Sequence, residues 1–185
     1  MSANKKRNSI KDTIWVFKGK SSLNKLSPVI PFSQSKRCIV FVGLHLYQQH
    51  SQTIDSYCKS LKEKDFAILQ VILYPTRDPK TISVHQAPNT LHLCLKDVSF
   101  SGFPKKEVLE KVQDFKADIF LNLNGTFSYS DMGFALSSRA PYRVSAYQLE
   151  YKPYFNILLK SRQEETLSDY LKSIDNFFKH LKGLN

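Results

Sequence analysis

Glycine is scarce in this sequence: the 185 residues contain six. None lies in a GxGxxG spacing after an apolar run, and no GxxxxGK[ST] motif is present, so the two common phosphate-binding loops lack their backbone cradle. Histidines are scattered, and neither HExxH, GxSxG nor a Cys/His cluster occurs. The sequence therefore predicts no catalytic residue, no metal site and no cofactor, and favours a protein that is not an enzyme.

Cysteine and long apolar runs are also sparse. The three cysteines, Cys38, Cys58 and Cys94, are odd in number and lie far apart without a CxxC spacing. This pattern is typical of buried free thiols in a reducing compartment. No stretch is long and apolar enough to cross a bilayer, and the first residues lack the apolar core of a secretory signal. We expect a cytoplasmic protein.

Acidic residues are nearly absent from the first 37 residues, where nine Lys/Arg accompany only Asp12 and give a net charge of +8. The whole chain carries +11, so the remainder carries +3. Ile10, Ile14 and Phe17 recur at helical spacing within residues 9–18, whereas residues 19–37 are rich in serine and proline and indicate a linker. We therefore predict a basic N-terminal arm and linker (residues 1–37), followed by one domain (residues 38–185).

The domain alternates apolar runs with amphipathic stretches. Runs typical of strands cover residues 38–43, 66–74, 91–95, 117–123, 142–147 and 154–159. Helical stripes fall around residues 54–61 and 108–115, a short helix fits residues 130–139, and a longer helix follows residue 166. This alternation predicts a three-layer, Rossmann-like α/β domain with a mostly parallel five- or six-stranded sheet. The third strand has alternating residues, as expected nearer a sheet edge.

Several segments between Lys96 and Gln148, among them KDVSFSGFPKKEV and ADIFLNLNGTFSYSDMGFALSSRAPYRVSAYQ, resemble an uncharacterised bacterial family of short α/β proteins with a basic N-terminal segment. That resemblance implies no known activity. ADIFLNLNG and the following helix also resemble, more weakly, the N-terminal domain of heptosyltransferase-type glycosyltransferases. This second resemblance implies a nucleotide-sugar site, although Asn122 and Asn124 stand where those enzymes carry Asp and Gln.

One edge of the predicted sheet offers candidate ligand residues. Ligands of open parallel sheets bind beyond the carboxyl ends of the strands. The first and fourth strands would bring polar residues to that rim, and helix capping and turn formation explain the same residue types without any ligand. The candidate rim residues are Gly43, His45, Asn124, Thr126 and Ser128, with Asp131 beside them.

The arm suggests a polyanionic partner, because clustered Lys/Arg neutralise phosphates and an aromatic side chain stacks on unpaired bases. We expect a module that binds RNA or a ribonucleoprotein, the ribosome included. The candidate nucleic-acid-binding residues are Lys5, Lys6, Arg7, Lys11, Trp15, Lys18 and Lys20. Four alternatives stay open: a solvated tail, an arm on an anionic membrane surface, a nucleotide- or nucleotide-sugar-binding enzyme-like domain, and a protein-interaction subunit.

Overall fold

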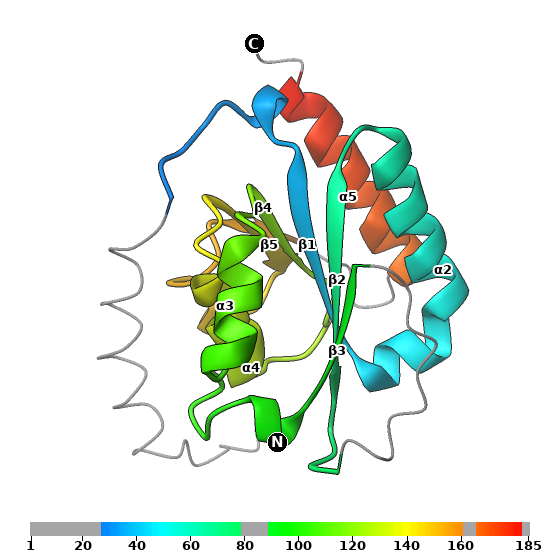
Figure 1. Cartoon of the computed structure of the whole chain (residues 1–185). Coiled ribbons are helices and arrows are strands. Elements are labelled where there is room, and N and C mark those ends of the chain that lie inside the picture. Colours follow the sequence, from blue (N-terminus) through cyan, green and yellow to red (C-terminus); the bar gives the residue numbers. More distant parts are fainter. Residues whose placement is uncertain (1–26, 79–88, 161–165, 183–185) are drawn as a thin grey trace.

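Six parallel strands form one sheet in the computed structural model, which describes residues 27–78, 89–160 and 166–182 (Figure 1). The sheet order is β3-β2-β1-β4-β5-β6. Its strands are β1 (Arg37–Gly43), β2 (Ala67–Tyr74), β3 (Thr90–Cys94), β4 (Ile119–Asn122), β5 (Tyr142–Ala146) and β6 (Ile157–Leu159). The chain runs outward from β1 to the edge strand β3, then returns to β4 on the other side of β1. The neighbours β1 and β4 therefore mark the point where the strand order reverses.

Four α-helices in the described residues cover the sheet: α2 (Leu44–Glu63), α3 (Lys106–Asp114), α4 (Tyr129–Ser137) and α5 (Leu167–Lys182). Helices α2 and α5 lie on one face, and α3 and α4 lie on the other (Figure 1). The expected three-layer, Rossmann-like class is confirmed, and the sheet is parallel throughout. Within the described residues, three short 3-10 helices join these elements: η1 (Phe32–Gln34), η3 (Leu95–Asp97) and η4 (Leu149–Tyr151).

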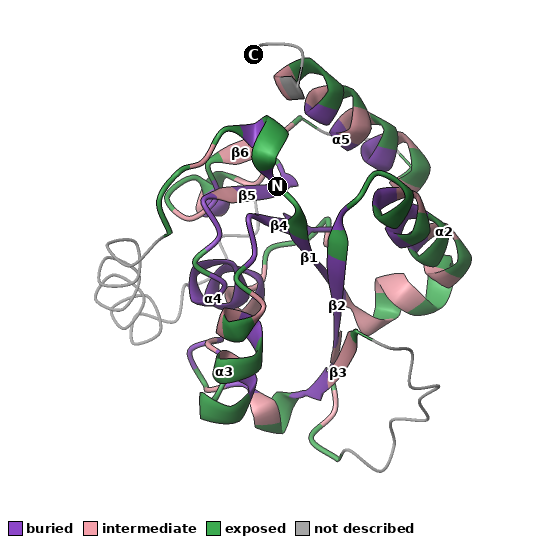
Figure 2. Ribbon diagram, turned by 45° about the horizontal axis from the view of Figure 1, so that its top comes forward, coloured by how far each residue is buried: buried purple, intermediate pink, exposed green. Residues whose placement is uncertain are grey.

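Strand β1 is a continuous apolar run because both of its faces are buried. Val40 and Val42 pack into the core under α2 and α5, whereas Ile39 and Phe41 pack into the core under α3 and α4. Successive side chains of a strand point to opposite faces, so both sets are buried (Figure 2). Each fully buried side chain of this size contributes roughly 1.5–3 kcal/mol.

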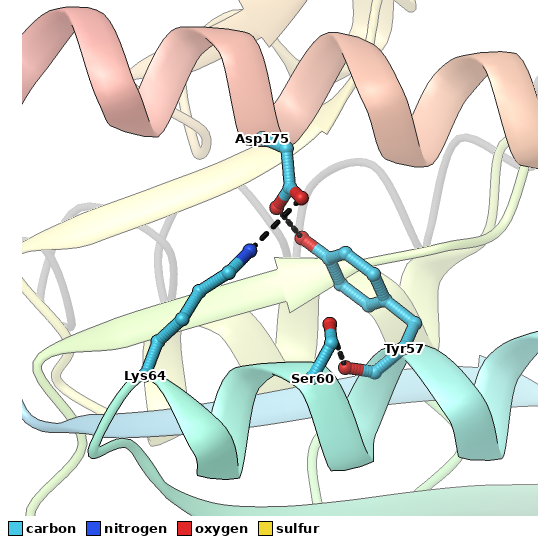
Figure 3. Close-up of polar contacts among 4 residues, drawn as sticks. All are labelled: Tyr57, Ser60, Lys64 and Asp175. Carbon is cyan, nitrogen blue, oxygen red and sulfur yellow. Dashed lines mark hydrogen bonds and ion pairs between the residues drawn. The ribbon is translucent and has the colours of Figure 1, made fainter.

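Helices α2 and α5 are joined by a polar contact on their shared face (Figure 3). The hydroxyl of Tyr57 donates to the Asp175 carboxylate over 3.2 Å, and Lys64 Nζ lies 2.9 Å from the same carboxylate. Within α2, the Ser60 hydroxyl donates to the Tyr57 carbonyl over 2.8 Å. Burial and the neighbouring Asp175 charge raise the pKa of Tyr57, so its phenol stays a hydrogen-bond donor.

The segment before β1 packs against the domain. Phe32 is 4% exposed, and its ring centroid lies 5.2 Å from that of Tyr142 and 4.9 Å from that of Phe178. The Tyr142 hydroxyl donates to the Ile30 carbonyl over 2.6 Å. Residues 27–36, expected to belong to the linker, are thus held to the sheet and to α5. The expected amphipathic segment, residues 9–18, lies outside the described residues.

All three cysteines are buried free thiols, as the sequence indicated. Burial raises the pKa of Cys38 and raises that of Cys58 to about 12, so neither thiol is reactive as a thiolate near neutral pH. Among the described residues, no helix combines the length and apolar character that a bilayer crossing requires.

Candidate functional site

The candidate site lies at the carboxyl ends of β1 and β4, the switch point of the sheet. Gly43 ends β1 and immediately precedes α2, and Asn124 follows β4. The amide N–H of Gly43 donates to Asn124 Oδ1 over 2.8 Å. In dinucleotide-binding sheets this backbone position approaches a pyrophosphate. Here a side-chain oxygen of the protein takes that hydrogen bond.

Asp131, in the first turn of α4, is the centre of the site. It is 1% exposed. Asn124 Nδ2 donates to Asp131 Oδ1 over 3.0 Å, and Asn122 Nδ2 donates to Asp131 Oδ2 over 3.1 Å. Among the described residues no Lys, Arg or His forms an ion pair with this carboxylate. Amide donors alone therefore hold it from the β4 side.

Tyr151, the last residue of η4, reaches the same carboxylate from the other side. Its hydroxyl lies 2.5 Å from Asp131 Oδ2 and accepts the Ser128 amide N–H over 3.0 Å. The Thr126 carbonyl lies 3.1 Å from this hydroxyl. One phenol carries one proton, and the shorter, charge-assisted bond to Asp131 takes it. Tyr151 is 0% exposed, so the phenol–carboxylate pair is closed to solvent.

The pKa values follow from this burial. Burial raises the pKa of the Asp131 carboxyl to about 6, and hydrogen bonds from Tyr151 and Asn122 keep the rise from being larger. Burial, together with the Asp131 charge, raises the pKa of Tyr151. The Asp131 carboxyl thus titrates closer to neutral pH, whereas the raised pKa makes the Tyr151 phenol a poor acid, and neither group is open to a substrate.

The network extends from the site into the sheet. Asn122 Nδ2 also donates to the Ser145 hydroxyl on β5 over 3.1 Å, and the Tyr170 hydroxyl on α5 donates to the Asn122 carbonyl over 3.2 Å. The hydrogen-bond network therefore joins β4, β5, α4, α5 and η4. Each donor and acceptor named here finds its partner within the protein, as buried polar groups must. This arrangement cross-links the elements and fills the switch point.

The predicted rim residues divide between this network and the surface. The site brings Gly43 and Asn124 together, while Thr126 and Ser128 contact Tyr151 through backbone atoms. The Ser128 hydroxyl also caps α4 by accepting the Ser130 amide N–H over 3.1 Å. His45, in the first turn of α2, is exposed, and within the described part of the chain no hydrogen bond joins it to the others.

Sequence reasoning did not place Ser145, Tyr151 or Tyr170 in this network. Ser145 interrupts an apolar strand, and a polar residue in a strand covered on both faces signals a buried partner. Tyr151 had no such signal, because η4 is a single short turn without periodicity.

No alternative centre is visible in the described ranges. No cluster of three or more His, Cys, Asp or Glu side chains there could bind a metal ion. His92, on the edge strand β3, bonds through Nδ1 to the Tyr74 hydroxyl at 3.0 Å, and burial lowers its pKa. The candidate nucleic-acid residues, from Lys5 to Lys20 with Trp15 among them, lie outside the described residues.

Comparison with known proteins adds nothing to this geometry: no family model, curated protein or solved structure matches the chain. The resemblances to the uncharacterised bacterial family and to the glycosyltransferases stay predictions.

Proposed function

We propose that this protein is a non-enzymatic α/β module that binds RNA or a ribonucleoprotein, such as the ribosome, through its basic N-terminal arm. The observation that carries the proposal is the separation of charge along the chain. Residues 1–37 hold a net charge of +8, and the remaining residues hold +3. Such a cationic segment attracts phosphate-rich partners by a force that salt screens.

The filled switch point supports a scaffold role for the domain. A nucleotide placed there would have to displace the Asn124 side chain from the Gly43 amide. Asp131 and Tyr151, the titratable groups at the centre of the site, are both buried. A substrate would thus have to open several elements before it touched either group. This weighs against the nucleotide-sugar alternative.

The arm would act in two ways. Its Lys and Arg side chains neutralise phosphates and release condensed counterions, and this release supplies most sequence-independent affinity. Trp15 can stack on an unpaired base, which contributes about 1–3 kcal/mol in other single-strand binders. Neither contribution depends on the base sequence, so we expect weak sequence preference and strong salt dependence.

The test is RNA binding by the full-length protein with a neutralised arm. Six cations are changed to Gln in the arm variant: Lys5, Lys6, Arg7, Lys11, Lys18 and Lys20. The matched control changes six exposed lysines of the domain to Gln: Lys59, Lys62, Lys96, Lys105, Lys106 and Lys160. With a fluorescein-labelled single-stranded RNA, we expect the arm variant to lose most of its affinity and the control to keep it. Equal losses in both variants would contradict the proposal.

Two further probes separate the alternatives. Anionic phospholipid vesicles that bind wild type but not the arm variant, with RNA binding unaffected by the arm, would favour the membrane alternative. A thermal-shift screen with nucleotides and nucleotide sugars tests the enzyme-like alternative, because a ligand at about 100 times its Kd stabilises a protein by about 2.7 kcal/mol. We expect no shift with either class.

A further inference from the structure

We infer that the domain itself carries a second RNA-contacting surface, at the edge of the sheet where the strands begin. This inference rests on the proposed function and extends it from residues 1–26 to the folded part of the chain, to which Lys36 and Arg37 belong although both were counted with the arm above. The cations of this surface are exposed and lie at or just before the starts of β1, β4 and β5. The amino-edge surface consists of Lys36, Arg37, Lys116 and Arg139.

Hydrogen bonds to Asp118 and the chain next to it gather the first three of these cations at one corner. The amide N–H groups of Lys36 and Arg37 both donate to Asp118 Oδ2, over 2.8 and 2.9 Å. The Asp118 amide N–H returns a bond to the Arg37 carbonyl over 2.8 Å. Lys116 precedes Asp118 by two residues. Because β1 and β4 are parallel neighbours, their first residues share this edge.

Arg139 connects this corner to the arm. The Tyr142 amide N–H donates to the Asp118 carbonyl over 3.2 Å, which places the start of β5 beside the start of β4. Three residues earlier, the Arg139 carbonyl accepts the amide N–H of Ser27 over 2.9 Å. Ser27 is the first described residue, so residues 1–26 attach to the domain next to Arg139. A phosphate chain bound to the arm is thereby held near the amino-edge surface.

The acids near this surface, Asp118, Asp114 and Asp65, form no ion pair with Lys36, Lys116 or Arg139. Asp118 is largely buried, accepts two amides and lies 4.0 Å from Arg37 Nε, so its charge is already shared. Asp114, at the end of α3, is the exposed acid nearest Lys116 in the sequence. Lys36, Lys116 and Arg139 form no ion pair with any described residue.

At the end of α2, on the same edge, cations lie beside acids. Lys64 is paired with Asp175 (Figure 3), and Lys62 is followed by Glu63. On the opposite rim, acids also follow the lysines in the sequence: Asp97 follows Lys96, and Glu107 follows Lys105 and Lys106. Helix C-termini favour cations through their dipole, which explains a Lys or Arg at any one helix end. It does not explain why the unpaired cations gather where the arm attaches.

The experiment compares two triple variants in the full-length protein. The edge triple is Lys36→Gln, Lys116→Gln and Arg139→Gln, and Arg37 is kept because it lies beside Asp118. The rim triple is Lys96→Gln, Lys105→Gln and Lys106→Gln, which removes the same charge. With single-stranded RNA, each lost phosphate contact flattens the slope of log K against log salt by about 0.7, so the edge triple should flatten it by about 2. At 0.1 M salt this corresponds to a loss of affinity on the order of 100-fold.

The rim triple should leave the slope within about 0.5 of the wild-type value. Equal effects of the edge and rim triples would overturn the surface while leaving the arm's role intact. Unchanged binding by the arm variant would instead refute the proposed function itself. The two failures are therefore distinguishable.

A second measurement needs no substitution. Acetylation of the wild-type protein with a lysine-reactive ester, with and without RNA, is read by mass spectrometry. We expect RNA to protect Lys36 and Lys116 but not Lys96 or Lys105. Equal modification of Lys36 and Lys116 in both conditions would overturn the inference.

Discussion

At the scale of single residues, the unusual group is the Asp131 carboxyl, a buried acid held by amides and a phenol rather than by a cation. Burying such a group costs free energy unless it is hydrogen-bonded. Truncating one of its partners leaves buried polar groups unsatisfied. Its raised pKa reflects that burial. The carboxyl thus links the stability of the site to pH.

The first prediction concerns this pH dependence. The pKa of Asp131 rises from 3.8 in the unfolded chain to about 6 in the folded protein, so the folded state binds an extra proton between those values. The free energy of unfolding should therefore fall as pH rises from about 4 to about 6, and then level off. Relative to Asp131→Asn, which does not titrate, wild type should lose about 2 kcal/mol across this range. Urea unfolding at several pH values measures the difference.

Comparing wild type with Asp131→Asn cancels the contributions of other titrating groups to the pH dependence. The lowered pKa of His92 acts in the opposite direction, raising stability as pH rises, but it is common to both proteins and cancels. A difference between the two proteins that is constant from pH 4 to pH 7 would show that Asp131 keeps an ordinary pKa.

The second prediction concerns Trp15, the single tryptophan of the chain. Its fluorescence therefore reports on the arm alone. If Trp15 stacks on a base, single-stranded RNA should quench this fluorescence to saturation, whereas polyphosphate, which has no bases, should not. Trp15→Ala should weaken RNA binding by about 1–3 kcal/mol without changing the salt slope. Unquenched fluorescence at saturating RNA would remove Trp15 from the contact.

At the scale of elements, the docked segment before β1 decides where the arm is anchored. Phe32 packs between Tyr142 at the start of β5 and Phe178 near the end of α5, and Figure 1 shows η1 beside that end of α5. The segment therefore contributes to the core cluster under α2 and α5. The basic arm is attached to a fixed point of the domain.

The third prediction tests this anchor. Phe32→Ala should lower the free energy of unfolding by about 3–5 kcal/mol, because it removes a buried ring and leaves a cavity. Val29→Ala, three residues earlier and 75% exposed, should change it by about 0.5 kcal/mol or less. Urea denaturation of both variants provides the measurement. If Phe32→Ala were as mild as Val29→Ala, residues 27–36 would not belong to the folded domain.

The elements themselves were largely predictable, because burial on both faces leaves a clear pattern. The run from Cys38 to Gly43 predicted β1, and the alternation of Leu91 and Leu93 with His92 predicted an edge strand, which β3 is. Phe32 was missed because one aromatic residue between Pro31 and Ser33 has no periodicity to reveal it. The strand order was also beyond reach, since helix and loop lengths alone do not determine which strands pair.

The candidate site was predictable only in part. Strand-end reasoning led to Gly43 and Asn124, which do meet, because parallel strands end at one edge. The closure of the site by Tyr151 depends on where a short irregular segment folds back, and no local pattern encodes that.

At the scale of the whole molecule, charge and fold are separated. The sheet and its helices supply a stable body with a filled switch point, and most of the positive charge lies in the arm. The sequence displays this separation directly, but only the structure relates the attachment point of the arm to the exposed cations of the amino-edge surface. The account therefore predicts that binding is distributed over arm and edge in proportion to their free cations.

The measurement that tests the central claim most directly is the salt dependence of RNA affinity for wild type and for the arm variant with six cations changed to Gln. Fluorescence anisotropy from about 50 to about 300 mM salt gives the slope of log K against log salt for each protein. The account predicts that the slope of the arm variant is less steep by about 4, which corresponds to six lost contacts on a single strand. Identical slopes for the two proteins would contradict it.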